Sequence, residues 1–413
     1  MYKLPRGWDW VCLNDLQADE PRAITDGPFG SNLTSAHYTA DGARVVRLQN
    51  IGDGVFNDAE AFISPKHFDT LKQHQVLAGD LLLASLGEDL PRACLAPPHL
   101  GPAVVKADCI RVRLSPRADP RWVLYALQTD NVRRWAKEHL HGVGRPRLGL
   151  TVIRAIPVPL PSLEEQQRIV EILEDHLSRL DAADDYVASA RTRAVAMRAS
   201  VLAHLWAESE RVGKLRSLAD LGRVVTGATP RHRVANQDAD TLPFVTPGDI
   251  GHGDKVGPVA RSLPRNSISP SRVLTTPGVL AVCIGATLGK VGWTARPVAT
   301  NQQINAVLVE PNVAGFVSAL MASPAFQSQM HEAASATTMP ILNKRQFSKL
   351  QVPIPSPPEQ QKLLGKLDSL LEAVRAVPAA AHQVQRREES LRRTLLHAAF
   401  SGRLTRNESA VAS

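Results

Sequence analysis

The sequence of 413 residues contains no apolar run of about twenty residues, so no membrane-spanning helix is expected. The N-terminal segment MYKLPRGWDW has no apolar signal core, and we expect a protein of the reducing cytoplasm. The four cysteines (Cys12, Cys94, Cys109 and Cys283) form no closely spaced pair. This spacing excludes a CxxC metal knuckle and argues against a disulfide framework.

Motifs of catalysis are also lacking. GATLGK (Gly285–Lys290) has three residues between its glycines where a phosphate-binding loop needs four, and Val291 replaces the Ser or Thr that would hold magnesium. There is no N/D-P-P-Y/F segment of the kind found in amino-methyltransferases, no G-x-G-x-x-G after a strand and no nucleophile elbow. His139 and His141 have no second ligand pair at useful spacing, so we expect surface or packed histidines. We therefore expect no catalytic residue and no metal site.

The composition is that of a globular protein with an excess of positive charge. Hydrophobic residues make up 44% and charged residues 21%, and the formal net charge of +8 permits a polyanionic partner without proving one. The 30 prolines indicate much loop and extended chain. The length is sufficient for two to four domains.

One segment occurs twice. LPSLEEQQRIVEILEDHLSRL begins at Leu160 and IPSPPEQQKLLGKLDSLLEAV begins at Ile354, and Gln166 corresponds to Gln360, 194 residues later. In each copy a serine precedes a glutamate by three residues (Ser162 and Ser356), which is a capping box and predicts a helix start.

Apolar residues then recur in steps of three and four over about 35 residues of each copy, which favours two long helices packed on each other. A single amphipathic helix lying on a globular core is the alternative for each stripe. Pro378 should kink or interrupt the second helix after Val377. The seam is predicted at Ile169, Leu173, Leu180, Val187, Met197, Val201, Leu363, Leu367, Leu370, Val374, Leu391 and Leu395.

The segments before the helices also repeat. VVRLQNIGDG (Val45–Gly54) resembles FVTPGDIGHG (Phe244–Gly253), and AGDLLLASLG (Ala78–Gly87) resembles PGVLAVCIGA (Pro277–Ala286), both 199 residues apart. Each predicts a short strand that ends in a glycine turn. The globular parts are therefore expected to be mixed α/β.

Chain connectivity predicts the arrangement of these parts. A helix of about 44 residues is roughly 65 Å long, whereas a compact domain of this size has a radius of gyration of about 15 Å. The ends of the second globular part cannot easily lie so far apart, so the helices should be antiparallel. We expect an α+β fold: two mixed α/β globular parts joined by two long antiparallel coiled-coil helices, as a pseudo-two-fold dumbbell. The expected boundaries are 1–161, 162–208 (central helix), 209–355, 356–405 (C-terminal helix) and a flexible tail at 406–413.

Basic and amide side chains in loops are the candidate DNA contacts. Arginine matches guanine edges and asparagine or glutamine matches adenine edges. Taken singly, each is more often a solvated loop residue, and Asn50 could merely cap a turn. The candidates are Gln49, Asn50, Arg92, Arg145, Arg147, Arg231, Arg233, Lys290, Gln302, Gln303, Asn343, Lys344 and Arg345.

The two repeated helix starts resemble the beginnings of the helical regions in specificity subunits of Type I restriction–modification systems. TLLHAAFSGRL (Thr394–Leu404) is similar to the family's usual end of the second helix. GATLGKVGW, TPGDIG and DGPFGSN resemble segments of its target recognition domains. The resemblance covers essentially the whole chain, and the twofold order of the parts is its specific feature. Pro378 and the ending ASVLAHLWAE of the first helix depart from the pattern.

The resemblance implies a role. Each globular part would be a target recognition domain for one half of a bipartite double-stranded DNA site, and the helices would set the spacing and bind two modification (methyltransferase) subunits. Restriction subunits, which translocate DNA and cleave it, would join through these. The chain itself would hold no cofactor, while S-adenosylmethionine, ATP and Mg²⁺ would bind the partner subunits. The assembled complex would then be an adenine DNA methyltransferase and ATP-dependent endonuclease. The alternatives are a coiled-coil scaffold that binds no DNA, and a nuclease or methylase whose site has no familiar motif.

Overall fold

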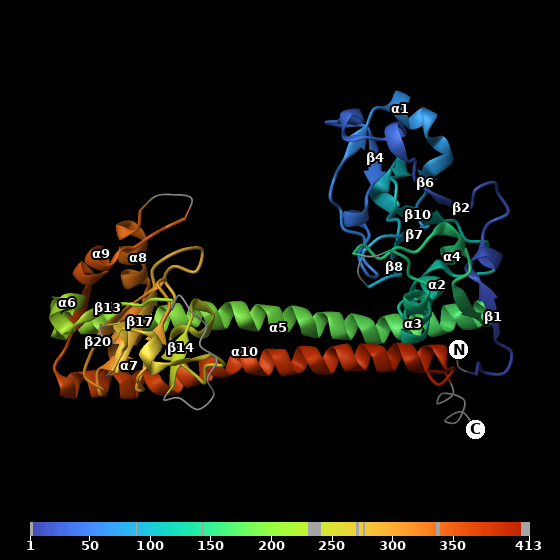
Figure 1. The fold of residues 1–413 in the computed structure, drawn as a ribbon. Coiled ribbons are helices and arrows are strands. Elements are labelled where there is room, and N and C mark those ends of the chain that lie inside the picture. The colour runs from blue at the N-terminus through green and yellow to red at the C-terminus, as the bar shows by residue number, and fades with distance from the viewer. Residues whose placement is uncertain are drawn as a thin grey trace, which may run out of the picture. The chain divides into compact units, whose positions relative to one another are not determined.

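The computed structural model describes residues 3–87, 89–142, 144–229, 241–269, 272–275, 277–335 and 339–405, without the side chains of Asn266, Leu367 and Asp368. The tail expected at 406–413 lies outside these residues. The chain forms two compact units, which we call the first unit (Met1–Tyr186 with Gln383–Ser413) and the second unit (Val187–His382). Each unit combines a globular α/β part with segments of two long helices (Figure 1).

The first unit contains three small sheets. The antiparallel pair is β1 (Asp9–Cys12) with β11 (Pro157–Leu160). A four-stranded sheet has the order β2 (Ile24–Asp26), β10 (Cys109–Val112), β7 (Leu81–Ala84), β8 (Arg92–Leu95). A five-stranded sheet has the order β3 (Tyr38–Thr39), β5 (Phe62–Ile63), β4 (Ala43–Val46), β9 (Ala103–Val105), β6 (Gln75–Val76). All four residues of β7 and of β10 are buried, which explains the continuous apolar run of β7. β10 also buries Arg111, whose guanidinium donates to Gln75 O (3.1 Å).

The second unit repeats this plan. Its antiparallel pair is β12 (Lys214–Ser217) with β21 (Gln351–Ile354). The five-stranded sheet has the order β13 (Val224–Thr226), β20 (Ile304–Leu308), β17 (Gly278–Val282), β18 (Val291–Thr294), β15 (His252–Lys255). The three-stranded sheet has the order β16 (Ser262–Pro264), β14 (Thr241–Val245), β19 (Ala299–Thr300).

The order of strands confirms that the repeat extends into the globular parts. The order β2-β10-β7-β8 in the first unit corresponds to β13-β20-β17-β18 in the second, and β5-β4-β9 corresponds to β16-β14-β19. The pairing of β4 with β9 is parallel, as is that of β14 with β19. Mixed sheets with helices at their faces make each globular part α+β, as the two repeated sequence patterns predict.

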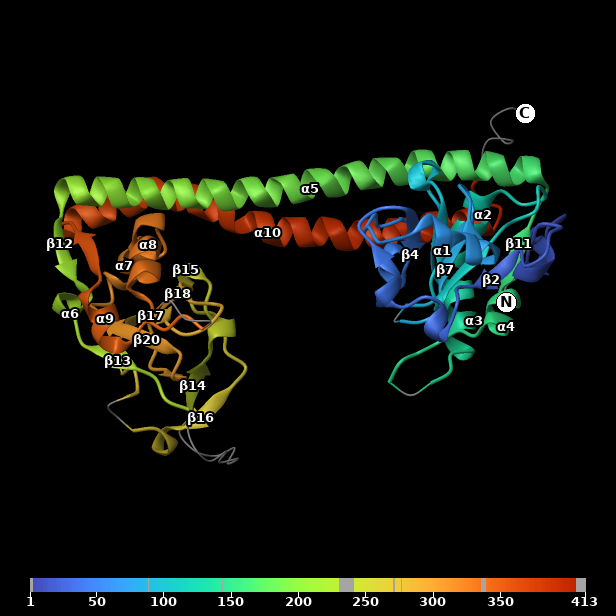
Figure 2. The same cartoon turned by 90° about the horizontal axis from the view of Figure 1, so that it is seen from above.

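Short helices cover the sheets. In the first unit they are α1 (Pro65–Thr70), α2 (Pro120–Leu127), α3 (Asp130–Glu138) and α4 (Leu150–Arg154). In the second unit they are α6 (Leu218–Leu221), α7 (Ala314–Met321), α8 (Pro324–Ala333) and α9 (Lys344–Lys349). Apolar side chains of α7 share a core with β17, β18 and β20, and Figure 2 shows α7 and α8 beside that sheet.

Two long helices follow the repeated serines. α5 spans Leu163–Val212 and α10 spans Pro357–Phe400. Ser162 Oγ accepts a hydrogen bond from Glu165 N (3.3 Å), and the Glu359 carboxylate accepts from Ser356 N (3.2 Å). The Glu165 carboxylate accepts from the Trp8 indole (3.2 Å), so the first helix start is also tied to the N-terminal segment.

The repeated glutamines Gln166 and Gln360 are buried at the helix starts. The Gln166 amide donates to the carbonyls of Pro161 and Arg117 (3.0 and 3.1 Å) and accepts from Asp119 N (2.9 Å). The Gln360 amide donates to Pro355 O (2.9 Å). A buried amide with satisfied partners fixes where the helix leaves the globular part, which explains why this residue occurs in both copies.

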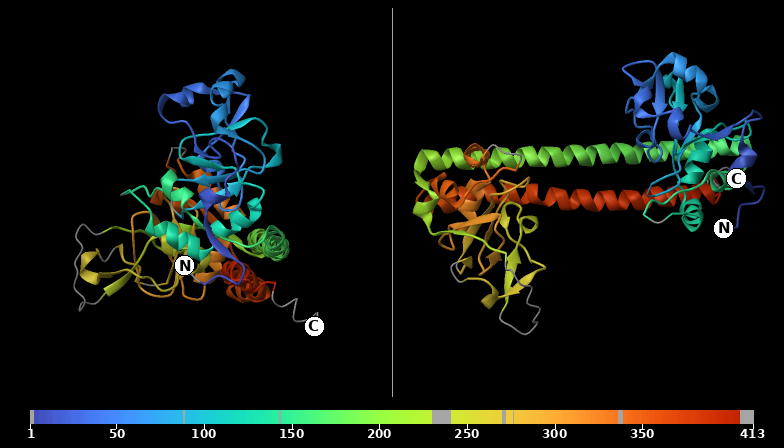
Figure 3. Two further views of the ribbon diagram at one scale, coloured as in Figure 1. Left: turned by 90° about the vertical axis from the view of Figure 1, so that its right-hand side faces the viewer. Right: turned by 45° about the horizontal axis from the view of Figure 1, so that its top comes forward.

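Segments of the two long helices pack side by side within each unit (Figures 2 and 3). In the first unit Asp181 of α5 forms an ion pair with Arg392 of α10. Asp184 of α5 lies within hydrogen-bonding reach of Glu388 of α10. Residue numbers rise along α5 as they fall along α10, so this pair is antiparallel. In the second unit Leu205 of α5 and Leu371 of α10 share one apolar core.

The predicted seam includes more residues than the helix contact buries. Ile169, Leu173, Val187, Val201 and Val374 are buried, and Leu180, Leu363 and Leu395 are half-buried. Met197, Leu370 and Leu391 are 46%, 40% and 46% exposed, so their assignment to the seam was wrong. From Val187 to Val201 the buried positions of α5 (Val187, Ala194 and Val201) recur every seven residues, which is one position per heptad. Two helices alone cover only a narrow strip of each other, and a straight α-helix drifts by about 20° per heptad.

Pro378 lies inside α10, and the helix continues through it. The predicted interruption after Val377 was therefore wrong, and the predicted kink stays a prediction. Pro378 is itself exposed, and its missing N–H leaves the carbonyl of Val374 in the preceding turn without its helical donor.

Candidate nucleic-acid interface

A glycine turn follows the central strand of each unit and is held in the same way. Gly87 and Gly285 have φ of 135° and 92°, which a residue with a side chain rarely adopts. Gly87 N donates to Pro146 O (3.2 Å) and Gly285 N donates to Pro340 O (3.0 Å). Both turns are thereby joined to a later loop of the same unit, which we call the returning loop.

A second backbone hydrogen bond between strand end and loop is also equivalent in the two units. Leu148 N donates to Ser85 O and Leu342 N donates to Cys283 O, both at 2.8 Å. The described residues of the two returning loops, 141–142 with 144–149 and 335 with 339–343, include several of the predicted DNA contacts. A common backbone frame thus presents different side chains in the two units.

Arg92 and Lys290 make equivalent contacts, although they differ in chemistry. The Arg92 guanidinium donates to Leu48 O (3.3 Å), and the Lys290 ammonium donates to Pro247 O (3.4 Å). Leu48 and Pro247 each begin a short 3₁₀ turn, Leu48–Asn50 and Pro247–Asp249. Each cation therefore holds the turn next to its glycine loop.

Asn50 lies in the interior, so its prediction as a DNA contact was wrong. It is 1% exposed, its Oδ1 accepts from Arg47 N (2.9 Å), and its amide donates to the carbonyls of Asn57 and Ala59 (2.7 and 2.8 Å). In the second unit Asp249 accepts from Thr246 N (2.8 Å) in the same way. The alternative that Asn50 caps a turn is confirmed, and its neighbour Gln49 is exposed.

Two arginines of the first returning loop are exposed, Arg145 and Arg147. The Arg147 guanidinium is paired with Asp108 (2.7 Å) and lies 5.7 Å from the centre of the Phe29 ring. Phe29 is itself 46% exposed, in the segment DGPFGSN. An exposed aromatic ring beside a guanidinium can stack on a base or contact the sugar–phosphate backbone. Phe29 is not among the candidates predicted from the sequence, although it lies in the segment DGPFGSN that resembles part of a target recognition domain.

Most candidate DNA contacts of the second unit lie on the segments that follow β19 and that begin α9. The Gln303 amide donates to Ile284 O (3.4 Å) beside the glycine turn, and Asn343 Oδ1 accepts from Gln346 N (2.9 Å) to cap α9. Lys344 and Arg345 follow on the exposed first turn of α9. Gln302 is exposed and bonded to Thr229, away from the turn. Arg231 and Arg233 lie outside the described residues.

A triad joins the second unit's sheet to its helices. Asp254 of β15 pairs with Arg198 of α5 (3.0 Å) and with Arg375 of α10 (2.6 Å). The sequence carried no signal for this contact, because its members are scattered along the chain. Nearby, burial and the positive charges of Arg198 and Lys290 lower the pKa of His252.

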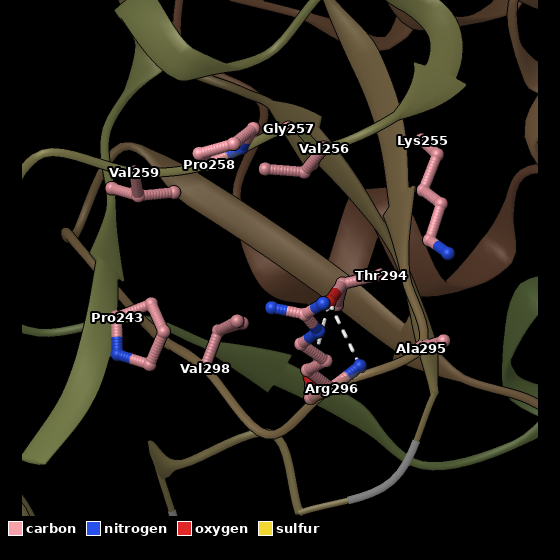
Figure 4. A pocket seen from close by; sticks show the side chains of 10 residues that line it. All are labelled: Pro243, Lys255, Val256, Gly257, Pro258, Val259, Thr294, Ala295, Arg296 and Val298. Atoms are coloured by element: carbon pink, nitrogen blue, oxygen red, sulfur yellow. Dashed lines mark hydrogen bonds between the residues drawn. The ribbon is translucent and has the colours of Figure 1, made fainter.

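A pocket of about 290 Å³ lies beside β14, β15 and β18 of the second unit (Figure 4). Its described lining combines apolar side chains with two cations, Lys255 and Arg296, and includes no carboxylate, histidine or cysteine. A general acid–base pair could not be assembled from this lining. At the corresponding place on β4 of the first unit, Arg44 pairs with Asp58 and Glu60.

The described residues show no other chemical centre. They contain no group of three or more His, Cys, Asp or Glu that could hold a metal ion. Burial raises the pKa of Cys94, Cys109 and Cys283 to about 12, which removes them as thiolate nucleophiles near neutral pH. The His139 ring stacks on Trp135, and His141 is exposed. No helix within the described part of the chain has the length and apolar character to cross a membrane.

Two regions of the chain match a known protein family. Residues 101–183 and 213–376, more than half of the chain, match the family described as Type I restriction modification DNA specificity domain. The chain belongs to this family. Its two matched regions fall in the two units, in agreement with the repeated strand order.

Two relatives that match part of this chain are named as specificity subunits of Type I restriction enzymes. The Type I restriction enzyme MjaIX specificity subunit of Methanocaldococcus jannaschii is 22% identical over 165 residues, 38% of each chain. The HindI specificity subunit of Haemophilus influenzae is 27% identical over 152 residues, 35% of this chain and 32% of the relative. These matches span about a third of the length of each relative.

Solved structures share the fold. One chain from a structure of the type I R-M system has a TM-score of 0.74 at 20% identity, covering 98% of this chain and 100% of that one. The HsdS subunit from Thermoanaerobacter tengcongensis has a TM-score of 0.54 at 19% identity, covering 97% and 98%. The family's specificity domain is thus present twice in one α+β chain.

Proposed function

We propose that this chain is the non-catalytic, sequence-specific DNA-binding subunit of a Type I restriction–modification complex, and that each unit contacts one half of a bipartite target. The observation that carries the proposal is the duplicated backbone frame. Each unit holds a glycine turn, a 3₁₀ turn and a returning loop with the same hydrogen bonds, while the exposed side chains differ. A shared frame with different side chains suits two recognition domains for two different sequences.

Charge supports a nucleic-acid partner. Arg145 and Arg147 are exposed on the loop of the first unit, and Lys344 and Arg345 are exposed on α9 of the second. Such cations bind phosphates and release counterions, which makes affinity fall with salt. Amide groups at Gln49 and Gln303 can donate to and accept from base edges.

The helices are proposed to bind the methyltransferase subunits. Leu370 and Met197 in the second unit, and Val384 and Leu391 in the first, are apolar and at least 40% exposed. Exposed apolar stripes on paired helices suit a helical partner that covers them. The dumbbell inferred from chain connectivity, with recognition domains held apart by an antiparallel rod, belongs to this proposal and predicts an elongated scattering profile in solution.

The experiment is DNA binding by the full chain, alone and assembled with its modification subunits, after sequencing of methylated adenines in the host genome has supplied the target. We expect a bipartite motif, higher affinity for that motif than for scrambled DNA, and loss of affinity with salt. Changing both Lys344 and Arg345 to alanine should weaken binding and affect one half-site only. A chain that assembles but binds no DNA would establish the scaffold alternative, and methyl transfer by the isolated chain would establish the enzyme alternative.

A further inference from the structure

Glu388 occupies a core position of the helix pair in the first unit. Buried positions of α10 recur every seven residues at Val374, Ala381 and Glu388, followed by the half-buried Leu395. Glu388 is only 5% exposed. A carboxyl group at a position that otherwise takes an apolar side chain needs a physical explanation.

The Glu388 carboxyl is shut off from solvent and faces another carboxyl. Both of its oxygens are buried, and neither has a hydrogen-bond donor among the described residues. Asp184 of α5, an exposed residue, is within hydrogen-bonding reach of the Glu388 carboxyl. Two carboxylates cannot bond to each other, but a carboxylic acid can donate to a carboxylate. The contact is therefore complete only when one of the two holds a proton.

The charges around Glu388 come from the same two helices. On α5 they are Asp184 and Asp181; on α10 the cation is Arg392, which is also paired with Asp181 and lies within range of the Tyr125 phenol of α2. Burial, followed by the bond to Asp184 and its charge, raises the pKa of Glu388 to about 7, and Arg392 opposes the rise.

The repeat shows that helix pairing does not require this carboxyl. The position 194 residues before Glu388 is the buried Ala194, and the position matched to Asp184 is Pro378. The positions matched to Asp181 and Arg392 are Arg375 and Arg198, which share Asp254. The carboxyl pair is thus particular to the first unit.

We propose that Glu388 and Asp184 share one proton in the folded protein, so that the helix contact of the first unit weakens as the pH rises through neutrality. At low pH one carboxyl O–H donates to the other carboxylate. At higher pH that proton leaves to solvent water, and the ionised Glu388 remains buried beside the carboxylate of Asp184, whose side chain is exposed. The device acts on the folded chain and does not depend on the proposed function.

The sign of the effect follows from proton counting. In the unfolded chain Glu388 ionises near its usual pKa of 4.5, whereas the folded form keeps the proton to about pH 7. Between these values the folded state binds more protons, so stability falls as the pH rises, by roughly tenfold in the unfolding constant per pH unit. Above the folded pKa the dependence levels off.

The test is hydrogen exchange of the full chain, corrected for intrinsic rates, in segment 383–400 between pH 5.5 and 8.5. We expect Glu388→Gln to be less protected relative to wild type at pH 5.5 than at pH 8.5, because the glutamine amide can donate to Asp184 without a titrating proton. Glu389→Gln is the matched control, since Glu389 is the exposed neighbour, and it should follow the wild type. Parallel pH profiles for wild type and Glu388→Gln would overturn the proposal.

A second measurement does not depend on stability. In protein labelled with ¹³C at glutamate carboxyls, the signal lost in Glu388→Gln should titrate near pH 7 in the wild type. Asp184→Asn replaces an anion with an amide donor and should move that midpoint down by about one pH unit or more. A wild-type midpoint below about 5, or one that Asp184→Asn leaves in place, would also overturn the proposal.

Discussion

Neighbouring polar residues in this chain have opposite roles. Gln49 is exposed on its turn, whereas Asn50 is buried and holds the turn with three hydrogen bonds. Arg92 and Lys290 likewise bond to backbone carbonyls of the turns at Leu48 and Pro247. Some polar residues therefore hold the turns of the candidate DNA surface in shape, and others are exposed on that surface and free to contact DNA.

Lys290→Ala tests that separation. If Lys290 mainly holds the 3₁₀ turn, affinity for the target should fall several-fold while the slope of log K against log salt stays unchanged. Lys290→Arg, which keeps a donor for Pro247 O, should restore target affinity. A slope lower by about one, with equal loss on all sequences, would instead make Lys290 a phosphate contact.

Asp254→Ala tests the triad of the second unit. Without the carboxylate, Arg198 and Arg375 face each other as like charges, and we expect a loss of about 1–2 kcal/mol in the free energy of unfolding, discounted because the three side chains are partly exposed. Urea denaturation measures it. Glu332→Ala removes an exposed carboxylate from the same unit and should cost much less. Equal losses would show that the triad does not stabilise the unit.

At the scale of elements, each long helix combines a start determined by nearby residues with a seam determined by packing. The starts rest on Ser162 and Ser356 and on the buried amides of Gln166 and Gln360. The seam takes one position per heptad over its middle part. Exposed apolar residues beside this narrow seam are what a binding partner could cover.

Leu173→Asp and Met197→Asp form a matched pair on α5. Both residues occupy the apolar stripe in the sequence, but Leu173 is 1% exposed and Met197 is 46% exposed. Burying a charge at Leu173 should cost several kcal/mol and make the chain insoluble or unfolded, whereas Met197→Asp should remain folded by circular dichroism. Met197→Asp should nevertheless weaken assembly with the modification subunits on size exclusion. Similar stability in the two variants would contradict the burial difference.

At the scale of the whole molecule, the proposed function requires a fixed distance between two recognition domains. Half-sites on one face of B-DNA are spaced at roughly 34–36 Å or multiples of it. Two helices of 50 and 44 residues are long enough to act as the spacer.

A paired insertion tests the spacer. One heptad added after Ala190 and another after Val384 keeps the heptad register in both helices and lengthens them by about 10 Å, or about three base pairs. We expect the two half-site sequences to stay the same while the spacer between them lengthens, or recognition to be lost because the second half-site is rotated by about 100°. Methylome sequencing of a strain with the variant measures the spacer. An unchanged spacer with full activity would mean that the helices do not set the distance.

Four features of this protein can be predicted from its amino-acid sequence alone: the duplicated plan, both helix starts, the mixed α/β globular parts and the family. These features depend on residues close together in the chain, such as a serine three positions before a glutamate or a strand ending in glycine, and so they are visible locally. Other features come from contacts between distant segments: Asn50 is buried, Met197, Leu370 and Leu391 are exposed, and Asp254 joins Arg198 to Arg375. Such contacts also place Glu388 opposite Asp184. Exposure and charge pairing depend on which distant segments pack together, and periodicity along one helix does not contain that information.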